Sequence, residues 1–188
     1  MKAVRSRRSV MVKVLATYVT GGLCGRAMSA VLSSPKQGAT VSIEGFDTKG
    51  VSQGVTEVSR VVKADDAWRE QLSRTAYAVT RHESTEAPFS GEYDHNHADG
   101  LYRCICCDTA LFDSRTKFDS GTGWPSFWKP VSSHNVLEKP DNTYGMQRTA
   151  VACRRCDAHL GHVFTDGPPP TGLRYCMNSV ALKFYRRA

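Results

Sequence analysis

The segment "CRRCDAHLGHVF", residues 153–164, places two cysteines and two histidines within twelve residues. Cys153 and Cys156 are separated by two residues, a spacing that lets one tight turn direct both thiolates at the same ion. A second pair, Cys104 and Cys107 in "CICC", precedes Cys153 by a spacer of 45 residues. Two such pairs provide the four sulfur ligands of tetrahedral zinc, so the sequence predicts a structural Zn²⁺ site formed by all four cysteines.

The predicted metal would hold two distant hairpins of one domain together, because a closed four-sulfur site leaves no open position for a substrate. Two disulfides in an exported protein are the alternative interpretation. A redox-active thioredoxin-type pair is disfavoured because no βαβ pattern surrounds either motif. Of the remaining cysteines, Cys24 lies near the N-terminus and Cys106 lies inside the first pair, where a small buried hydrophobe is expected.

The seventh cysteine, Cys176, stands alone in "GLRYCMNSVALKF", residues 172–184. If this segment is one strand, Arg174, Cys176 and Asn178 share a face, which continues into a core through Val180, Leu182 and Phe184. A cation and an amide donor beside a thiol favour its thiolate form. Cys176 is therefore a candidate nucleophile as well as a candidate structural thiol.

Two further groups of residues are candidates for the same site. His159 and His162 closely follow the fourth predicted zinc ligand, and imidazoles near a reactive cysteine act as acid or base around neutral pH. The loop "FDSGTGWPSFW", residues 118–128, carries Trp124 and Phe127, which suit an apolar wall for a substrate. The histidines could equally be further metal ligands or surface residues, and the aromatic residues could be core.

The residues that lead into the domain predict one helix followed by many short strands. "ADDAWREQLSRTAYAVTR", residues 64–81, repeats apolar residues every fourth position at Trp68, Leu72 and Ala76, and Asp65 or Asp66 could cap it. Downstream, short apolar runs alternate with Gly, Pro, Asp and Asn, a pattern typical of strands and tight turns. The fold class is therefore mainly β, with antiparallel sheets and one or two N-terminal helices.

The N-terminal residues have the composition of a leader. The net charge of +7 comes from seven basic residues before Glu44, which leaves 18 Lys and Arg against 18 Asp and Glu in the rest. The domain therefore has no basic footprint for nucleic acid. The leader fits an organellar transit peptide or, through "SRRSVMVK" at residues 6–13, a twin-arginine export signal; a disordered tail on a cytoplasmic protein is the alternative.

Residues 33–60 are rich in Gly, Ser and Thr with little periodicity, which predicts a flexible linker. We accordingly assign residues 1–60 to leader and linker and residues 61–188 to the domain. No stretch approaches the roughly 18 to 20 apolar residues that span a bilayer, so no membrane span is expected.

Several motifs together resemble the B-type methionine sulfoxide reductases, which reduce the R epimer of methionine sulfoxide. They are "STEAPFSGEY", "SGTGWPSF", "CDAHLGHVF", "DGPPPTGLRYCMNS" and the two cysteine pairs, in that order over about residues 64–185. The resemblance implies a small, open, barrel-like domain of two antiparallel sheets. It also implies that the chain repairs oxidised proteins as a monomer.

Site roles carry over to matching positions of this sequence. Cys176 corresponds to the family's catalytic cysteine, and Trp124 to the aromatic residue that packs on the substrate's methyl group. The residues that correspond to its remaining catalytic groups are His159, His162, Asn178, Arg174 and Asp166. Attack by Cys176 on the sulfoxide sulfur, with a proton from one of the two histidines, would give methionine and a sulfenic acid.

One position departs from the commonest family pattern. Thr122 stands where many members have a cysteine that attacks the sulfenic acid, so this chain resembles the single-cysteine subgroup, which includes plastid-type members with "CCDT" and "FDSGTGWPS". Regeneration is then expected from thioredoxin or from glutathione with glutaredoxin, with Cys106 as an alternative. The rival functions are a zinc-ribbon binding module and a metal hydrolase that uses His159 and His162.

Overall fold

The computed structural model describes residues 38–187, so the predicted leader and the first residues of the predicted linker lie outside the described residues. Two helices, α1 (Asp65–Gln71) and α2 (Arg74–His82), are followed by nine short strands. These strands are β3 (Gly100–Cys104), β4 (Ala110–Asp113), β5 (Lys117–Phe118), β6 (Ser126–Phe127), β7 (Val136–Asp141), β8 (Arg148–Cys153), β9 (His159–Phe164), β10 (Arg174–Met177) and β11 (Leu182–Arg186). Two more strands, β1 (Thr40–Phe46) and β2 (Ser52–Ser59), precede the helices.

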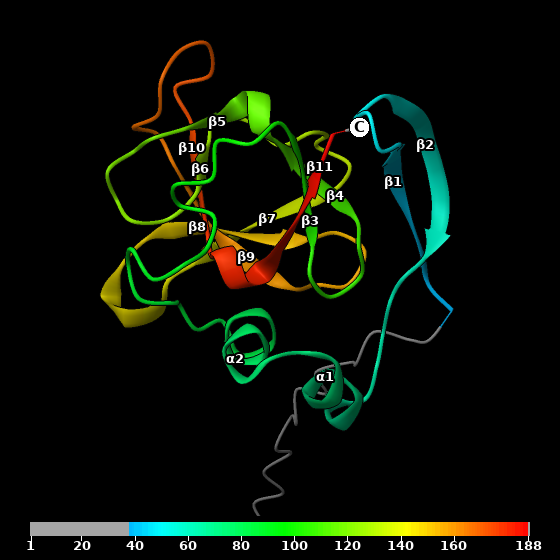
Figure 1. The fold of residues 1–188 in the computed structure, drawn as a ribbon. Helices are drawn as coiled ribbons and strands as arrows, with labels where there is room; N and C mark the ends of the chain where they lie inside the picture. The colour runs from blue at the N-terminus through cyan, green and yellow to red at the C-terminus, as the bar shows by residue number, and fades with distance from the viewer. Residues whose placement is uncertain (1–37, 188) are drawn as a thin grey trace, which may run out of the picture. The chain divides into compact units, whose positions relative to one another are not determined.

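The strands form antiparallel sheets, as the sequence predicts. One sheet has six strands in the order β5-β6-β10-β9-β8-β7, a second has the order β11-β3-β4, and β1 pairs only with β2 (Figure 1). Within residues 38–187, no helix has the length and apolar character needed to cross a membrane. The mainly β fold class with N-terminal helices is confirmed.

One face of the six-stranded sheet forms the core. Phe127 is fully buried and stacks on Phe112 of the smaller sheet, with ring centroids 4.5 Å apart, and it meets Tyr102 edge-on at 5.0 Å. Tyr175 and Met177 of β10 are buried as well. Because side chains alternate along a strand, burying these residues leaves Arg174 and Cys176 on the opposite face of β10.

The predicted single helix is divided in two. Leu72 has an extended backbone at the end of α1, and the hydroxyl of Ser73 accepts a hydrogen bond from the Ala76 N–H at 3.1 Å, which caps α2. The N-cap of α1 is Ala64, without a side-chain cap, so the prediction of an aspartate cap is wrong. The apolar stripe itself is confirmed, because Trp68, Leu72 and Ala76 are all buried.

The predicted continuous strand over residues 172–184 is also divided. It comprises β10 and β11, which belong to different sheets and are joined by a 3₁₀ turn over Ser179–Ala181. The buried carboxylate of Glu86 accepts hydrogen bonds from the Ser179 N–H at 2.6 Å and the Val180 N–H at 3.0 Å. These bonds satisfy backbone donors that leave the sheet ladder at the turn, so a distant residue fixes where the chain changes sheets.

The structure corrects the prediction of a flexible linker over residues 33–60, because β1 and β2 form a hairpin within that stretch. The fully buried Asn135 binds its backbone twice: the Asn135 Nδ2 donates to the Glu44 carbonyl at 2.9 Å, and the Glu44 N–H donates to Asn135 Oδ1 at 2.8 Å. The composition of residues 33–60 does not reveal the hairpin, because Asn135, which binds it, lies 91 residues after Glu44.

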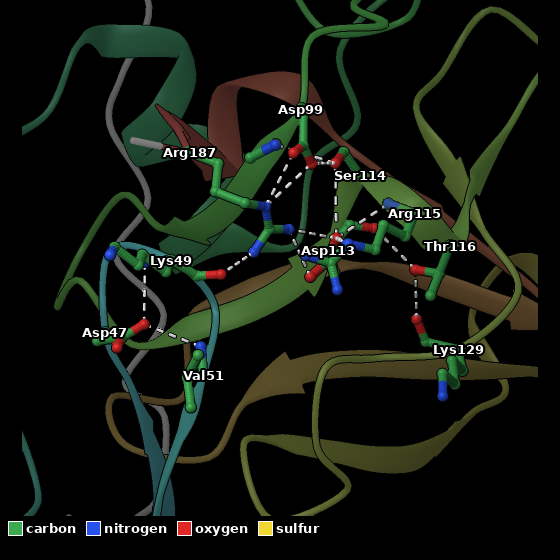
Figure 2. Close-up of polar contacts among 11 residues, drawn as sticks. Asp47, Lys49, Val51, Asp99, Asp113, Ser114, Arg115, Thr116, Lys129 and Arg187 are labelled. Carbon is green, nitrogen blue, oxygen red and sulfur yellow. Dashed lines mark hydrogen bonds and ion pairs between the residues drawn. The ribbon is translucent and has the colours of Figure 1, made fainter.

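Arg187, near the C-terminus, holds the hairpin's turn (Figure 2). Its guanidinium donates to the Lys49 carbonyl and forms ion pairs with Asp113 at 2.8 Å and Asp99 at 3.0 Å. Figure 2 shows these groups around one guanidinium, with Ser114 linked to both carboxylates. Asn135 and Arg187 therefore attach the hairpin to the later part of the domain, at Glu44 and at the turn respectively.

Candidate functional site

The site is built on the face of the six-stranded sheet that is turned away from the core. Cys176 of β10 lies directly opposite His162 of β9 on one side and Ser126 of β6 on the other. Directly paired residues of antiparallel strands point to the same face with Cβ atoms about 5 Å apart. Sheet register thus brings the thiol and one imidazole together across the sheet.

A β-bulge adds the second imidazole to this face. Simple alternation would place His159 and His162 on opposite faces, but the register with β8 shifts between Val151 and Ala152. As a result the two rings lie 5.3 Å apart in an edge-on arrangement. Gly161 permits this path, because a Cβ there would lie 2.1 Å from the Cys176 carbonyl oxygen.

A pocket of about 150 Å³ opens above Cys176. Its lining residues come from the sheet, from the loop before β6 and from the segment after α2: Thr85, Trp124, Arg148, Gly161, His162, Phe164, Cys176, Met177 and Asn178. Trp124 is held in place by its indole N–H, which donates to the Glu86 carbonyl at 3.2 Å. Phe127 does not line the pocket and is fully buried in the core, so its predicted substrate contact is wrong.

The surroundings of Cys176 differ from the predicted ones. Burial raises the pKa of the Cys176 thiol above its usual value, and the Thr122 hydroxyl, 3.8 Å from Sγ, and the Arg174 charge act in the opposite direction. Asn178 lines the pocket, but its amide is used elsewhere: Oδ1 accepts from the Glu86 N–H at 3.0 Å and Nδ2 donates to the Leu160 carbonyl at 3.0 Å. Asn178 therefore fixes the backbone beside Cys176, and the hydroxyl groups that act to lower the pKa of the thiol belong to Thr122 and Ser126.

Asp166 acts on the site through Arg174. The two side chains form a bidentate pair at 2.9 and 2.8 Å, with Asp166 largely exposed and Arg174 largely buried over the Phe164 ring. Arg174 lies two residues before Cys176 on the same face of β10. The predicted positive charge beside Cys176 is present, and Asp166 orients it.

The two histidines have different environments. His159 is buried with no hydrogen-bond partner for Nε2 among the described residues, and burial lowers the pKa of His159 to about 4. His162 lines the pocket, and its Nε2 lies 2.8 Å from the Asp141 carboxylate. Of the two, His162 is the imidazole placed to exchange a proton with a bound molecule.

Sequence reasoning missed four residues that shape the site: Glu86, Thr122 as a hydrogen-bond donor, Asp141 and Arg148. Glu86 lies in the motif "STEAPFSGEY", but nothing in that motif reveals that the Glu86 carboxylate is buried against backbone N–H groups. Asp141 and Arg148 are directly paired at the ends of β7 and β8, so a prediction of that hairpin's register could have found them.

The four predicted metal ligands lie together. The sulfur atoms of Cys104, Cys107, Cys153 and Cys156 are all within 4.8 Å of one another, and two of the separations are 3.6 and 3.5 Å. Four sulfurs at about 2.3 Å from a tetrahedral Zn²⁺ would be about 3.8 Å apart, so the arrangement fits such an ion. The pairs come from the β3–β4 and β8–β9 turns and so connect the two sheets.

Both cysteine turns have the same backbone design. Each ends in an aspartate with positive φ, Asp108 at 62° and Asp157 at 55°, whose N–H donates to the carbonyl of the first cysteine at 2.9 Å. Aspartate tolerates this left-handed conformation better than most residues. The local sequence Cys-x-x-Cys-Asp is thus suited to a turn that presents two thiols.

Comparison with known proteins agrees with this geometry, since the SelR domain matches residues 72–186. The chain belongs to the SelR-domain family. It is 59% identical over 125 residues to the peptide methionine sulfoxide reductase MsrB of Herminiimonas arsenicoxydans, which covers 66% of this chain and 91% of that protein. The MsrB of Thioalkalivibrio sulfidiphilus is 61% identical over 120 residues, which are 64% of this chain and 88% of that protein. The MsrB of Pseudomonas syringae pv. syringae is 55% identical over 131 residues, 70% of this chain and all of that protein.

Membership in the SelR-domain family confirms the resemblance drawn from the sequence motifs. The matched residues 72–186 contain all four clustered cysteines and every residue that lines the pocket. Among residues 38–187, Cys176 is the only cysteine on that pocket, whereas Cys106 is buried within the core beside the four clustered cysteines. Regeneration through Cys106 would require that region to open.

Proposed function

We propose that this chain reduces methionine sulfoxide in oxidised proteins, with preference for the R epimer and with Cys176 as the nucleophile. The observation that carries the proposal is the direct cross-strand pairing of Cys176 with His162 on the floor of a small pocket walled by Trp124. The similar proteins of Herminiimonas arsenicoxydans and Thioalkalivibrio sulfidiphilus are named as peptide methionine sulfoxide reductases.

The proposed reaction transfers one oxygen atom. The Cys176 thiolate attacks the sulfoxide sulfur while protonated His162 donates its proton to the sulfoxide oxygen. The oxygen ends on Cys176 as a sulfenic acid, the S–O bond to the substrate is broken, and methionine leaves two electrons richer. Arg174 and the Thr122 hydroxyl stabilise the thiolate before the attack, against the effect of its burial.

Stereochemical preference would follow from the two different walls of the pocket. The indole of Trp124 suits the methyl group of the substrate, whereas His162 lies where the oxygen must be protonated. With the sulfur above Cys176, only one epimer directs its methyl group and its oxygen to these walls together.

An external thiol would complete the cycle. Thr122 Oγ1 is 3.8 Å from Cys176 Sγ, so position 122 is close enough for a resolving residue, but a hydroxyl cannot form a disulfide. Two thiols from thioredoxin, or from glutathione with glutaredoxin, would convert the sulfenic acid to the thiol and water and leave as a disulfide.

The sulfur cluster is proposed to hold Zn²⁺ through Cys104, Cys107, Cys153 and Cys156. Four thiolates complete the coordination, so the ion would contribute stability rather than a reaction step. A destination for the leader, plastid, mitochondrion or twin-arginine export, remains a prediction that the mature N-terminus would test.

The test is the substitution Cys176→Ser. It should lower R-sulfoxide reduction by at least about 1,000-fold, because serine is a far weaker nucleophile near neutral pH. Metal content should stay at the wild-type value, and the S epimer should be a poor substrate of both proteins. Appreciable turnover by the serine variant would refute the assignment.

A further inference from the structure

Asp141, the last residue of β7, makes four hydrogen bonds with its carboxylate. Oδ1 accepts from the Thr143 N–H at 2.9 Å and from the Thr143 hydroxyl at 2.6 Å. Oδ2 accepts from Arg148 at 2.8 Å and from His162 Nε2 at 2.8 Å. The side chains of Asp141 and His162 are each only 13% exposed, so water screens this contact weakly.

The contact between Asp141 on β7 and His162 on β9 reaches across the strand between them, β8. β8 lies between β7 and β9, and its residue opposite His162 is Ala150, which has no atoms beyond Cβ. Asp141 is itself paired with Arg148, two residues before Ala150 on the same face of β8. The Asp141 carboxylate can therefore reach over Ala150 to the imidazole, with Arg148 beside it.

The direction of the hydrogen bond follows from charge. Hydrogen bonds from Thr143 and His162 hold the pKa of Asp141 well below its usual range, so the carboxylate is ionised and can only accept. The proton in the contact therefore belongs to His162 Nε2. The remaining ring nitrogen, Nδ1, is then the one available to a molecule in the pocket.

We infer that Asp141 is a positioning residue that orients the His162 imidazole through Nε2, so that Nδ1 delivers a proton into the pocket. The inference rests on the proposed function, because it names the group that prepares the proposed proton donor. Asp141 does not line the pocket and therefore acts through His162.

Three other ionisable groups face His162 or its partner: His159 on the same strand, Cys176 on β10 and Arg148 on β8. All three are retained when Asp141 alone is replaced, so a change in activity or in the position of the His162 hydrogen reports on the Asp141 carboxylate.

The first experiment compares Asp141→Asn with the wild type and with Thr143→Val, which removes a bond to Asp141 without removing the carboxylate. Asp141→Asn should lower kcat by about 10- to 100-fold with KM changed by less than about threefold, because proton transfer by a positioned acid contributes about 10²- to 10⁴-fold. Thr143→Val and Asp141→Glu, which keep a carboxylate, should retain more activity.

A double substitution separates positioning from general damage. If Asp141 acts through His162, Asp141→Asn should cost less than about threefold in a His162→Gln background. An equal loss in both backgrounds would overturn the inference. If Asp141→Asn proves unfolded by circular dichroism, the same comparison is made with Asp141→Ser, which also removes the carboxylate.

The second experiment does not depend on turnover. NMR of the ring nitrogens locates the hydrogen of the neutral His162 ring, which should lie on Nε2 in the wild type and move in part to Nδ1 in Asp141→Asn. The same distribution of the hydrogen in both proteins would overturn the inference. A wild-type protein that lacks R-sulfoxide reductase activity but carries the hydrogen on Nε2 would instead refute the proposed function and keep the Asp141–His162 contact.

Discussion

The sulfur cluster and Cys176 are two thiol environments in one small domain, and they differ in what surrounds the sulfur. Each clustered sulfur has three others within 4.8 Å, supplied by two turns of the same design. Cys176 has no second thiol on its pocket among the described residues, and its neighbours are a hydroxyl, an imidazole and a guanidinium. Burial is common to both regions. The groups around each sulfur therefore decide whether a cysteine is suited to bind a metal ion or to act as a nucleophile.

The largest effect is expected when one cysteine of the sulfur cluster is replaced. Cys153→Ser removes one of four ligands, and structural zinc contributes about 10 kcal/mol or more to folding in small metal-dependent domains. We expect loss of bound metal and of the cooperative thermal transition, measured by metal analysis and circular dichroism.

Cys106→Ser is the matched control for this experiment, since Cys106 is buried between Cys104 and Cys107 in the other cysteine turn but is outside the four-sulfur cluster. It should retain metal. A metal-free Cys153→Ser protein with the wild-type melting temperature would show that the cluster is not structural.

A second, smaller effect concerns the buried histidine His159, which follows the clustered Cys156 and precedes Cys176 in the sequence. Burial lowers the pKa of His159 to about 4, so the unfolded chain takes up this proton more readily than the folded protein. Stability should therefore fall as the pH drops from roughly 6.5 to about 4, by about 3 kcal/mol from this group.

The substitution His159→Gln should remove that contribution. Urea unfolding of the metal-bound proteins at several pH values would measure it, with the difference between variant and wild type cancelling what other groups contribute. Parallel pH dependences of the two proteins would contradict the expectation.

The smallest effect is expected when the hydroxyl group beside Cys176 is removed. Thr122→Val keeps the shape of the side chain but removes the hydroxyl 3.8 Å from Cys176 Sγ, which should raise the pKa of the thiol further. Alkylation of Cys176 by iodoacetamide at pH 7 should slow by about two- to fivefold. Thr122→Ser keeps the hydroxyl and should react like the wild type; equal slowing of both variants would show that packing is responsible.

The cysteine pairs could be read from the sequence because each pair is local. The Cys-x-x-Cys spacing and the following aspartate specify one turn, and only the meeting of the two turns required the fold. The helical stripe at Trp68 was predictable for the same reason, since its period is a property of neighbouring residues.

The predictions that the structure corrects depended on contacts between residues that are far apart in the sequence. Phe127 is three residues from Trp124, which lines the pocket, yet strand register places Phe127 in the core beside Phe112. Composition predicts a linker where the hairpin over residues 40–59 lies, because Asn135 and Arg187, which hold the hairpin, are far away in the sequence.

The sequence by itself determined which residues can do chemistry: four thiols at metal-binding spacing, one separate thiol, two histidines and the absence of a cysteine at position 122. The tertiary structure decided how they are used. A bulge placed His159 and His162 on one face, and sheet register set Cys176 opposite His162 and Asp141 within reach of it. The physical reason is that spacing constrains only neighbouring residues, whereas register and burial depend on contacts between strands that no local pattern encodes.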